Sequence, residues 1–257
     1  MKFAIYLPPS IELNSATTAP VMYVLSGRGS NETNFINKSG FQRFAAKVGL
    51  VVVCSDTSPR DTGIEGENEG HLVGSGVSYY VNATSDKWKS HYQMYTYISE
   101  ELPAVIEENF KQVDTTRASI CGHSMGGHGA LMAAFKRPGS YKCVSAFAPV
   151  TSVIASPRQQ TTMIAYLGEN RDNWKEWDAV ELMKTYDGPE LDILIDQGSV
   201  DEYLKVSILP ELLMAHIPPK SVNVNYRMHA NYDHGYSFIQ TFIEDHIRFH
   251  AKNLGLV

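Results

Sequence analysis

Short apolar runs rich in β-branched residues alternate along this chain with longer stretches in which apolar residues recur at helical spacing. A chain with this alternation is expected to form a mostly parallel sheet, because the connection between two parallel strands crosses a face of the sheet as a helix. We therefore expect an α/β fold with helices on both faces of a central sheet. The predicted strands are 2–7, 20–26, 50–55, 117–122, 142–148, 191–196 and 222–228, and the predicted helices lie near 38–48, 90–110, 125–136, 175–185, 205–215 and 236–252.

The final predicted helix shows the amphipathic pattern most clearly. Its apolar stripe consists of Phe238, Phe242, Ile243, Ile247 and Phe249, and its polar residues Glu244, Asp245 and Arg248 are spaced to face away. His246 and His250 stand four residues apart on the same helix, a spacing that some zinc sites use. No glutamate stands where such a motif needs one, so both histidines are predicted to lie on a solvated face.

Two irregular stretches interrupt the alternation, at 56–86 and 149–174. Long connections in compact domains are usually either functional or disordered. The aromatic residues Tyr79, Tyr80 and Trp88 favour loops that pack near a site. Residues 1–257 show no repeat, charge block or low-complexity linker, so we expect one domain.

Charge and hydropathy exclude two classes of partner. The 22 basic and 28 acidic residues give a net charge of −6, and the basic residues are scattered, so no nucleic-acid partner is expected. No window approaches the ~20 consecutive apolar residues of a membrane span, so no membrane partner is expected either. The apolar stretch within the first ten residues is too short for the hydrophobic region of a signal peptide, which favours a cytoplasmic protein.

The three cysteines, Cys54, Cys121 and Cys143, each lie in an apolar, strand-like run. An odd number of cysteines in a chain large enough to bury a core does not indicate a disulfide framework. Reduced, buried thiols are therefore predicted, in agreement with a cytoplasmic location.

The strongest local motif is Gly122-His123-Ser124-Met125-Gly126, which stands between a predicted strand and a predicted helix. A G-x-S-x-G sequence in this context is typical of a nucleophile elbow, in which a tight turn exposes the serine at the carboxyl end of the sheet and glycines allow neighbouring backbone to approach. A serine that only caps the helix would need no glycine at both flanking positions. Ser124 is therefore the candidate nucleophile.

A serine hydroxyl needs a base, and the base needs an acid to orient it. Asp196 stands at the end of strand 191–196 and Asp201 in the loop after it, and the loop after strand 222–228 supplies His229 and His234. The order serine, aspartate, histidine is that of α/β hydrolases. His234 is favoured as the base because His229 can still belong to the strand, whereas spacing alone leaves both aspartates open.

The remaining histidines are less well placed, because His123 and His128 are tied to the elbow, His91 lies on a helix and His216 precedes a proline.

An acyl-transfer site also needs two N–H donors for the oxyanion. The backbone N–H of Met125 follows the nucleophile at the start of a helix, and the N–H of Arg28 lies in the loop after strand 20–26. No dinucleotide-binding, Walker, C-x-x-C or H-E-x-x-H motif occurs, so no cofactor and no metal are expected.

With these residues in place, the chain resembles the S-formylglutathione hydrolase (esterase D) family over nearly its whole length. The matching segments include KFAIYLPP, NFINKSG, GSGVSYYVNATSDKWKSHYQMYTYISEELP, ICGHSMGGHGAL, LDILIDQG and YDHGYSFIQTFIEDHIRFHAK. The resemblance implies an α/β-hydrolase fold and a triad of Ser124, Asp201 and His234. It also implies a cytoplasmic, often dimeric thioesterase that converts S-formylglutathione to glutathione and formate in formaldehyde detoxification, and that accepts small aryl esters.

Three departures from the family pattern bear on specificity. The family's LSGLTCT loop reads Leu25 to Asn31 here, with Arg28 beside the oxyanion position and Ser30 in place of a cysteine. Its SWDFG stretch reads Gly70 to Gly74, with His71 in place of the tryptophan. Ser30 and His71 are therefore the candidate substrate-binding residues. The family has an additional segment before KFAIYLPP that has no counterpart in this sequence. A hairpin at the edge of the sheet is therefore expected to be missing.

The hypothesis from sequence is a serine thioesterase acting on a small thioester or ester. A general short-chain carboxylesterase is the nearest alternative. A non-catalytic α/β-hydrolase relic used for binding is an alternative of another class, and an acyltransferase is disfavoured because nothing marks a site for an acceptor alcohol.

Overall fold

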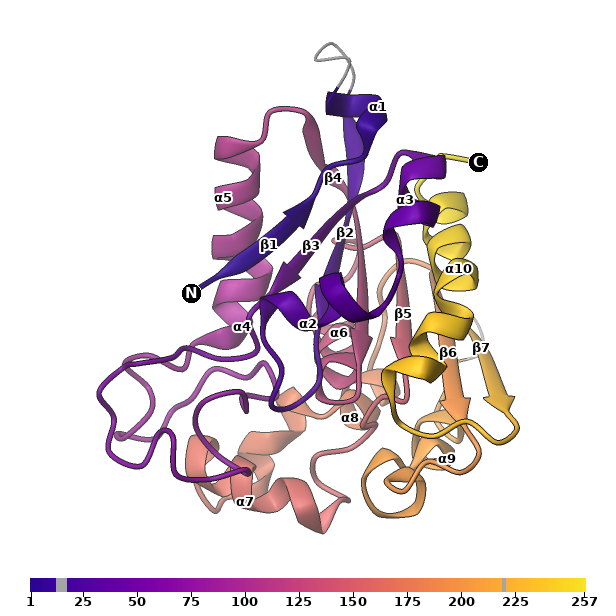
Figure 1. Ribbon diagram of the computed structural model, residues 1–257. Helices are drawn as coiled ribbons and strands as arrows, with labels where there is room; N and C mark the ends of the chain where they lie inside the picture. Colours follow the sequence, from indigo (N-terminus) through magenta and orange to yellow (C-terminus); the bar gives the residue numbers. More distant parts are fainter. Residues whose placement is uncertain (13–17, 219–220) are drawn as a thin grey trace.

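The computed structural model describes residues 1–12, 18–218 and 221–257. The seven strands of these residues form one sheet in the order β1-β3-β2-β4-β5-β6-β7, in which only the edge strand β1 runs antiparallel to its neighbour (Figure 1). The α/β-hydrolase fold predicted from the sequence is confirmed. The strands are β1 (Phe3–Tyr6), β2 (Ala19–Leu25), β3 (Val51–Ser55), β4 (Val113–His123), β5 (Cys143–Phe147), β6 (Leu191–Gly198) and β7 (Val222–His229).

All seven predicted strands are present, whereas the predicted helices are more broken than expected. The helix predicted near 38–48 is α3, which begins only at Gln42, and the preceding α2 was not predicted; Gly40, with a φ of 71°, lies between the two. The segment near 90–110 includes a π-helical stretch at Tyr97–Glu101. The α-helices are α1 (Pro9–Glu12), α2 (Glu32–Lys38), α3 (Gln42–Val48), α4 (Met94–Thr96), α5 (Leu102–Asn109), α6 (Met125–Lys136), α7 (Pro157–Leu167), α8 (Ala179–Lys184), α9 (Pro210–Met214) and α10 (Tyr236–Asn253).

The prediction of an irregular stretch at 149–174 was wrong in part, because α7 occupies 157–167. The buried face of this helix includes Gln159 and Thr162 beside Met163, Tyr166 and Leu167. Polar side chains at buried positions weaken the apolar period that identifies a helix in a sequence. Pro157 at its start was the available signal, since proline is favoured in the first turn.

Helices cover both faces of the sheet, as the alternation of side chains along β5 shows. Cys143, Ser145 and Phe147 point to one face, where they contact histidines of α10. Ala146 points to the other face, where its Cβ lies 3.5 Å from an ideal Cβ position on Gly127 of α6. In Figure 1, α3 and α10 lie side by side in front of the sheet and α6 lies behind it.

The loop 56–86 packs against the rest of the protein, as its aromatic residues predicted. Tyr79 and Tyr80 are 3% and 0% exposed. The Tyr166 hydroxyl of α7 ties this loop down, because it accepts from the Gly74 N–H and donates to the Val77 carbonyl. The loop therefore forms a fixed wall beside the carboxyl ends of the strands (Figure 1).

The three cysteines are free and buried, which confirms that part of the sequence interpretation. Among the described residues, no helix combines the length and apolar character that crossing a membrane would require.

Candidate active site

Ser124 occupies the turn between β4 and α6 in a strained backbone conformation, with φ 56° and ψ −117°. A non-glycine residue in this region costs on the order of 1–3 kcal/mol and persists only where the surroundings fix it. Here the Ser124 N–H donates to the Phe147 carbonyl, and the Ser124 carbonyl accepts from the N–H groups of His128 and Val150. The backbone of the turn is thus held from β5, α6 and the loop after β5.

The two glycines of the motif are required by close backbone contacts. A Cβ on Gly126 would lie 1.9 Å from the Leu25 carbonyl oxygen, and a Cβ on Gly122 would lie 2.0 Å from the Gly126 carbonyl oxygen. A larger residue at Gly126 would push the first turn of α6 away from β2, and one at Gly122 would push it away from β4. The nucleophile-elbow geometry predicted from the sequence is present.

The Ser124 side chain is not a helix cap. Its hydroxyl accepts no hydrogen bond from the first turn of α6, and within the described residues it has no other hydrogen-bond partner. The side chain is half-buried and lines a cavity of about 30 Å³. A small hydroxyl in a constrained turn is thus open to a molecule that enters this cavity.

His234 is paired with Asp201. Its Nδ1 lies 2.6 Å from Oδ2 of Asp201, whose side chain is fully buried. Asp201 also accepts from the Tyr203 N–H at 2.7 Å and from the Gln197 amide at 3.0 Å. Burial alone would raise the pKa of Asp201, but these hydrogen bonds and the neighbouring His234 outweigh burial and lower it. Asp201 therefore remains a carboxylate and accepts a hydrogen bond from His234 Nδ1–H.

Two rings fix the orientation of the His234 imidazole. The ring centroid of Tyr203 lies 4.9 Å away in an edge-on arrangement, and that of His123 lies 4.6 Å away. His123 Nε2–H donates to the His234 carbonyl at 3.1 Å. Burial, with the neighbouring His234, lowers the pKa of His123 to about 3, so His123 stays neutral and adds no charge beside His234.

The structure brings Ser124 and His234 to the same edge of the sheet without a direct hydrogen bond between them. The link is His123, which precedes Ser124 in the chain and packs on the His234 ring. Catalytic hydrogen bonds are often long without substrate and shorten in the substrate complex. The arrangement can therefore support proton transfer from a serine once a substrate fills the cavity.

A second set of serine, histidine and aspartate side chains lies deeper in the fold. Ser145 Oγ lies 2.8 Å from both His246 Nδ1 and His250 Nε2, and His246 Nε2 lies 3.2 Å from Asp196 Oδ2. By distance alone these residues could form a triad. All four are 0% exposed, so no substrate can reach the Ser145 hydroxyl, and the set joins α10 to the sheet.

The prediction that His246 and His250 lie on a solvated face was therefore wrong. Polar partners inside the fold satisfy both rings, a compensation that the apolar period of α10 cannot reveal. The other aspartate left open by the sequence, Asp196, belongs to this network and also pairs with Arg227 at 2.6 Å. Burial would raise the pKa of Asp196, but the hydrogen bonds from His246 and Arg227 hold it well below its usual range.

Two backbone N–H groups beside Ser124 remain available as donors. The turn after β2 lies against Ser124, since a Cβ on Gly27 would be 3.3 Å from the Ser124 Cβ. Gly29 N–H bonds to Gly76 and fixes this turn, while the Arg28 N–H has no acceptor in the described residues. The Met125 N–H stands in the first turn of α6, where helix N–H groups have no partner within the helix.

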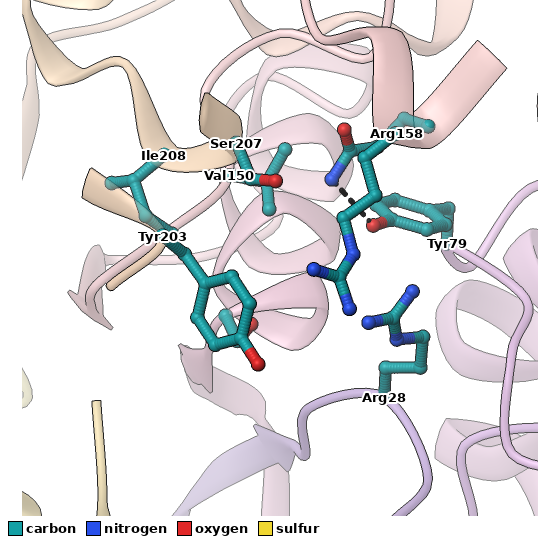
Figure 2. A pocket seen from close by; sticks show the side chains of 9 residues that line it. Arg28, Tyr79, Val150, Arg158, Tyr203, Ser207 and Ile208 are labelled. Carbon is teal, nitrogen blue, oxygen red and sulfur yellow. Dashed lines mark hydrogen bonds between the residues drawn. The ribbon is translucent and has the colours of Figure 1, made fainter. Parts of the chain in front are cut away.

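The cavity includes Ser124, Arg28 and Tyr79, which the sequence singled out, and several residues that were missed. Ser124 and Arg28 line it, whereas Ser30 and His71 do not; Ser30 accepts from Arg60 through its carbonyl, and His71 is exposed. The role assigned to Ser30 and His71 stays a prediction. The residues that the sequence interpretation missed are Val150, Arg158, Gln159, Tyr203, Ser207 and Ile208 (Figure 2).

Among the described residues, no group of three histidine, cysteine, aspartate or glutamate side chains could hold a metal ion.

Comparison with known proteins shows that this chain is similar to esterases. The esterase family model, described as "Putative esterase", matches residues 1–249. The S-formylglutathione hydrolase of Rattus norvegicus is 50% identical over 255 residues, which cover 99% of this chain and 89% of that protein. The S-formylglutathione hydrolase of Arabidopsis thaliana is 46% identical over 256 residues, which cover 100% of this chain and 89% of that protein.

A solved structure is similar over the same extent. An S-formylglutathione hydrolase from Agrobacterium tumefaciens superposes with a TM-score of 0.93 at 40% identity, covering 98% of this chain and 90% of that one.

Proposed function

The chain belongs to the S-formylglutathione hydrolase family of esterases, and on that premise we propose that it is a serine thioesterase that hydrolyses S-formylglutathione to glutathione and formate. The single observation that carries the mechanism is the 2.6 Å contact of His234 with Asp201 beside the strained Ser124 turn. A free serine hydroxyl, an oriented imidazole and a buried carboxylate are the parts that acyl transfer through a serine requires.

In the proposed first step, Ser124 Oγ attacks the thioester carbonyl while His234 Nε2 takes the hydroxyl proton. Collapse of the tetrahedral intermediate breaks the C–S bond, and His234 returns the proton to the departing thiolate, which leaves as the glutathione thiol. Water then attacks the formyl ester on Ser124, with His234 again as the base. Formate leaves and the Ser124 hydroxyl is restored.

Asp201 keeps the Nδ1–H tautomer of His234, so that Nε2 is free to accept the serine proton. The tyrosine and histidine rings against His234 prevent the imidazole from turning away. The oxyanion lies between the N–H groups of Met125 and Arg28, which support it from the helix start and from the turn after β2.

The experiment compares wild-type protein with Ser124→Ala using a fluorophosphonate probe and S-formylglutathione. Wild-type protein is labelled on the peptide that contains Ser124 and hydrolyses the thioester, and the variant does neither while keeping its circular dichroism spectrum. Absence of labelling at Ser124 in folded wild-type protein would overturn the proposal and favour a binding protein. Labelling with efficient turnover of p-nitrophenyl acetate but not of S-formylglutathione would favour a general carboxylesterase.

We also propose that the enzyme acts in formaldehyde detoxification in the cytoplasm, where a reducing environment suits its three buried thiols. A homodimer is proposed from the family resemblance, and sedimentation at several protein concentrations tests it.

A further inference from the structure

Two guanidinium groups meet in the cavity above Ser124. Arg28 enters from the turn after β2, and Arg158 enters from the first turn of α7 (Figure 2). The two side chains point toward one another from opposite walls. Like charges repel, so such a pair is expected where an anion lies between the two groups for part of the working cycle.

Neither guanidinium has an acidic partner within the described residues. By contrast, Arg60, Arg227 and Arg248 each bond a carboxylate at 2.6–2.9 Å. Burial lowers the pKa of Arg28, and the nearby charge of Arg158 lowers it further. Two guanidinium groups without an acidic partner among the described residues therefore line the same cavity.

Neighbouring side chains position Arg158. The Arg158 guanidinium lies over the Tyr203 ring, 4.8 Å from its centroid, and Tyr203 in turn packs on His234. The Gln159 amide donates to the Tyr79 hydroxyl at 2.8 Å on the opposite wall. The position of Arg158 is thus linked by direct packing to the proposed catalytic histidine.

Two further polar atoms in the cavity lack a partner. Gln159 Oε1 and Ser207 Oγ make no hydrogen bond within the described residues. Both residues are buried, with exposed fractions of 2% and 3%. A buried polar atom without a partner costs on the order of 1–3 kcal/mol. The Ser207 hydroxyl can donate to an anionic oxygen, so an anionic ligand would supply the partner that Ser207 lacks.

We propose that this cavity binds a carboxylate of the substrate between Arg28 and Arg158, so that the enzyme selects thioesters or esters with a carboxylate near the scissile carbonyl. Planar guanidinium groups match the geometry of a carboxylate and bond it in pairs. This inference rests on the proposed role of Ser124, because the carboxylate is positioned relative to that hydroxyl.

The size of the cavity limits how far the carboxylate lies from the reacting carbon. A space of about 30 Å³ holds one small group, not a long chain. Beside it, Arg158 also borders a larger groove of about 510 Å³ with Lys205 and Val206, which can take the remainder of a substrate. The carboxylate can therefore belong to a short acyl group or to the thiol that leaves.

Four substrates distinguish these sources. p-Nitrophenyl acetate and S-acetyl-N-acetylcysteamine carry no carboxylate, mono-p-nitrophenyl succinate carries one on its acyl group, and S-acetylglutathione carries carboxylates on its thiol. For each, kcat/KM is measured in wild-type protein, Arg28→Gln and Arg158→Gln. The readout is the ratio of anionic to neutral substrate within each chemical type, ester or thioester.

We expect each glutamine variant to lower at least one of these ratios by about 10- to 100-fold, the effect of losing a hydrogen bond to a charged group. A fall in the ester ratio alone assigns the carboxylate to the acyl group, and a fall in the thioester ratio alone assigns it to the thiol. Succinate is expected to inhibit p-nitrophenyl acetate hydrolysis competitively, and this inhibition is expected to weaken in the same variants. Unchanged ratios in both variants would overturn the inference.

Arg43→Gln is the matched control. Arg43 lies on α3, does not line the cavity and has no carboxylate partner in the described residues, so its loss changes the net charge equally. If Arg43→Gln lowers the ratios as much as Arg158→Gln does, the effect is one of overall charge and the inference fails.

Failure of the proposed function looks different, because wild-type protein would then hydrolyse none of the four substrates and take no fluorophosphonate label.

Discussion

Asp201 and Asp196 lie five residues apart at the end of the same strand, yet only Asp201 contacts the imidazole of His234, at 2.6 Å. Asp196 is still in β6 and bonds Arg227 of the adjacent strand β7 and His246 of α10. One carboxylate thus faces the cavity end of the sheet and the other faces the interior.

This division predicts opposite consequences for two identical substitutions. Asp201→Asn removes the charge that stabilises the imidazolium and presents an amide to Nδ1, so kcat should fall by on the order of 10³–10⁴ with little loss of stability. Asp196→Asn leaves Arg227 and His246 without their carboxylate and should lower the free energy of unfolding by about 2–4 kcal/mol.

Steady-state hydrolysis of S-formylglutathione and urea unfolding, measured on both variants, check this prediction, and each variant serves as the control for the other. A large kinetic loss confined to Asp196→Asn would contradict the assignment.

The strained backbone of Ser124 predicts a gain in stability at the expense of activity. At φ 56° and ψ −117°, glycine avoids the steric penalty that a Cβ carries. We expect Ser124→Gly to be more stable than Ser124→Ala by about 1 kcal/mol, while both are inactive. Thermal and urea unfolding of the two variants measure the difference, and equal stability would show that the turn stores no strain.

The glycine at the start of α6 should tolerate no side chain. Because a Cβ on Gly126 would meet the Leu25 carbonyl at 1.9 Å, Gly126→Ala must displace backbone and should destabilise the protein by about 1–3 kcal/mol. The same shift separates the turn of Arg28 from Ser124, so kcat should fall as well.

Gly70→Ala is the control, because the nearest atom to a Cβ there lies 3.8 Å away. Similar effects of the two substitutions on stability and kcat would mean that the contact with Leu25 is not what constrains the elbow.

The seven strands could be predicted because buried parallel strands read as continuous apolar runs, as at Val51–Ser55. The choice between Asp196 and Asp201 could not, since spacing does not tell where a loop turns back. Arg158 was missed because it lies on α7, whose buried face carries Gln159 and Thr162 and so lacks an apolar period. The residues that shape the cavity come from loops and helix starts, where pattern carries little information.

The buried histidines of α10 predict how stability depends on pH. Burial, with the nearby His246, lowers the pKa of His250 to about 3, whereas a histidine in the unfolded chain titrates near 6.5. Between these values the unfolded chain binds a proton that the folded protein does not. The stability contributed by neutral His250 is therefore complete above about pH 6.5 and is lost as the pH falls toward about 3, by about 1.4 kcal/mol per pH unit.

His250→Leu should remove this dependence while leaving His246 to bond the Ser145 hydroxyl. We expect the free energy of unfolding of the variant to fall less steeply than that of wild-type protein between pH 6 and pH 4.5, by about 1.4 kcal/mol per pH unit. Ile247→Val, a buried apolar change on the same helix, should lower stability by about 0.5–1.5 kcal/mol at every pH without changing the slope. Urea titrations across this range provide the measurement. Parallel curves for wild-type protein and His250→Leu would mean that His250 is protonated inside the fold, because only then would its removal leave the proton balance of unfolding unchanged.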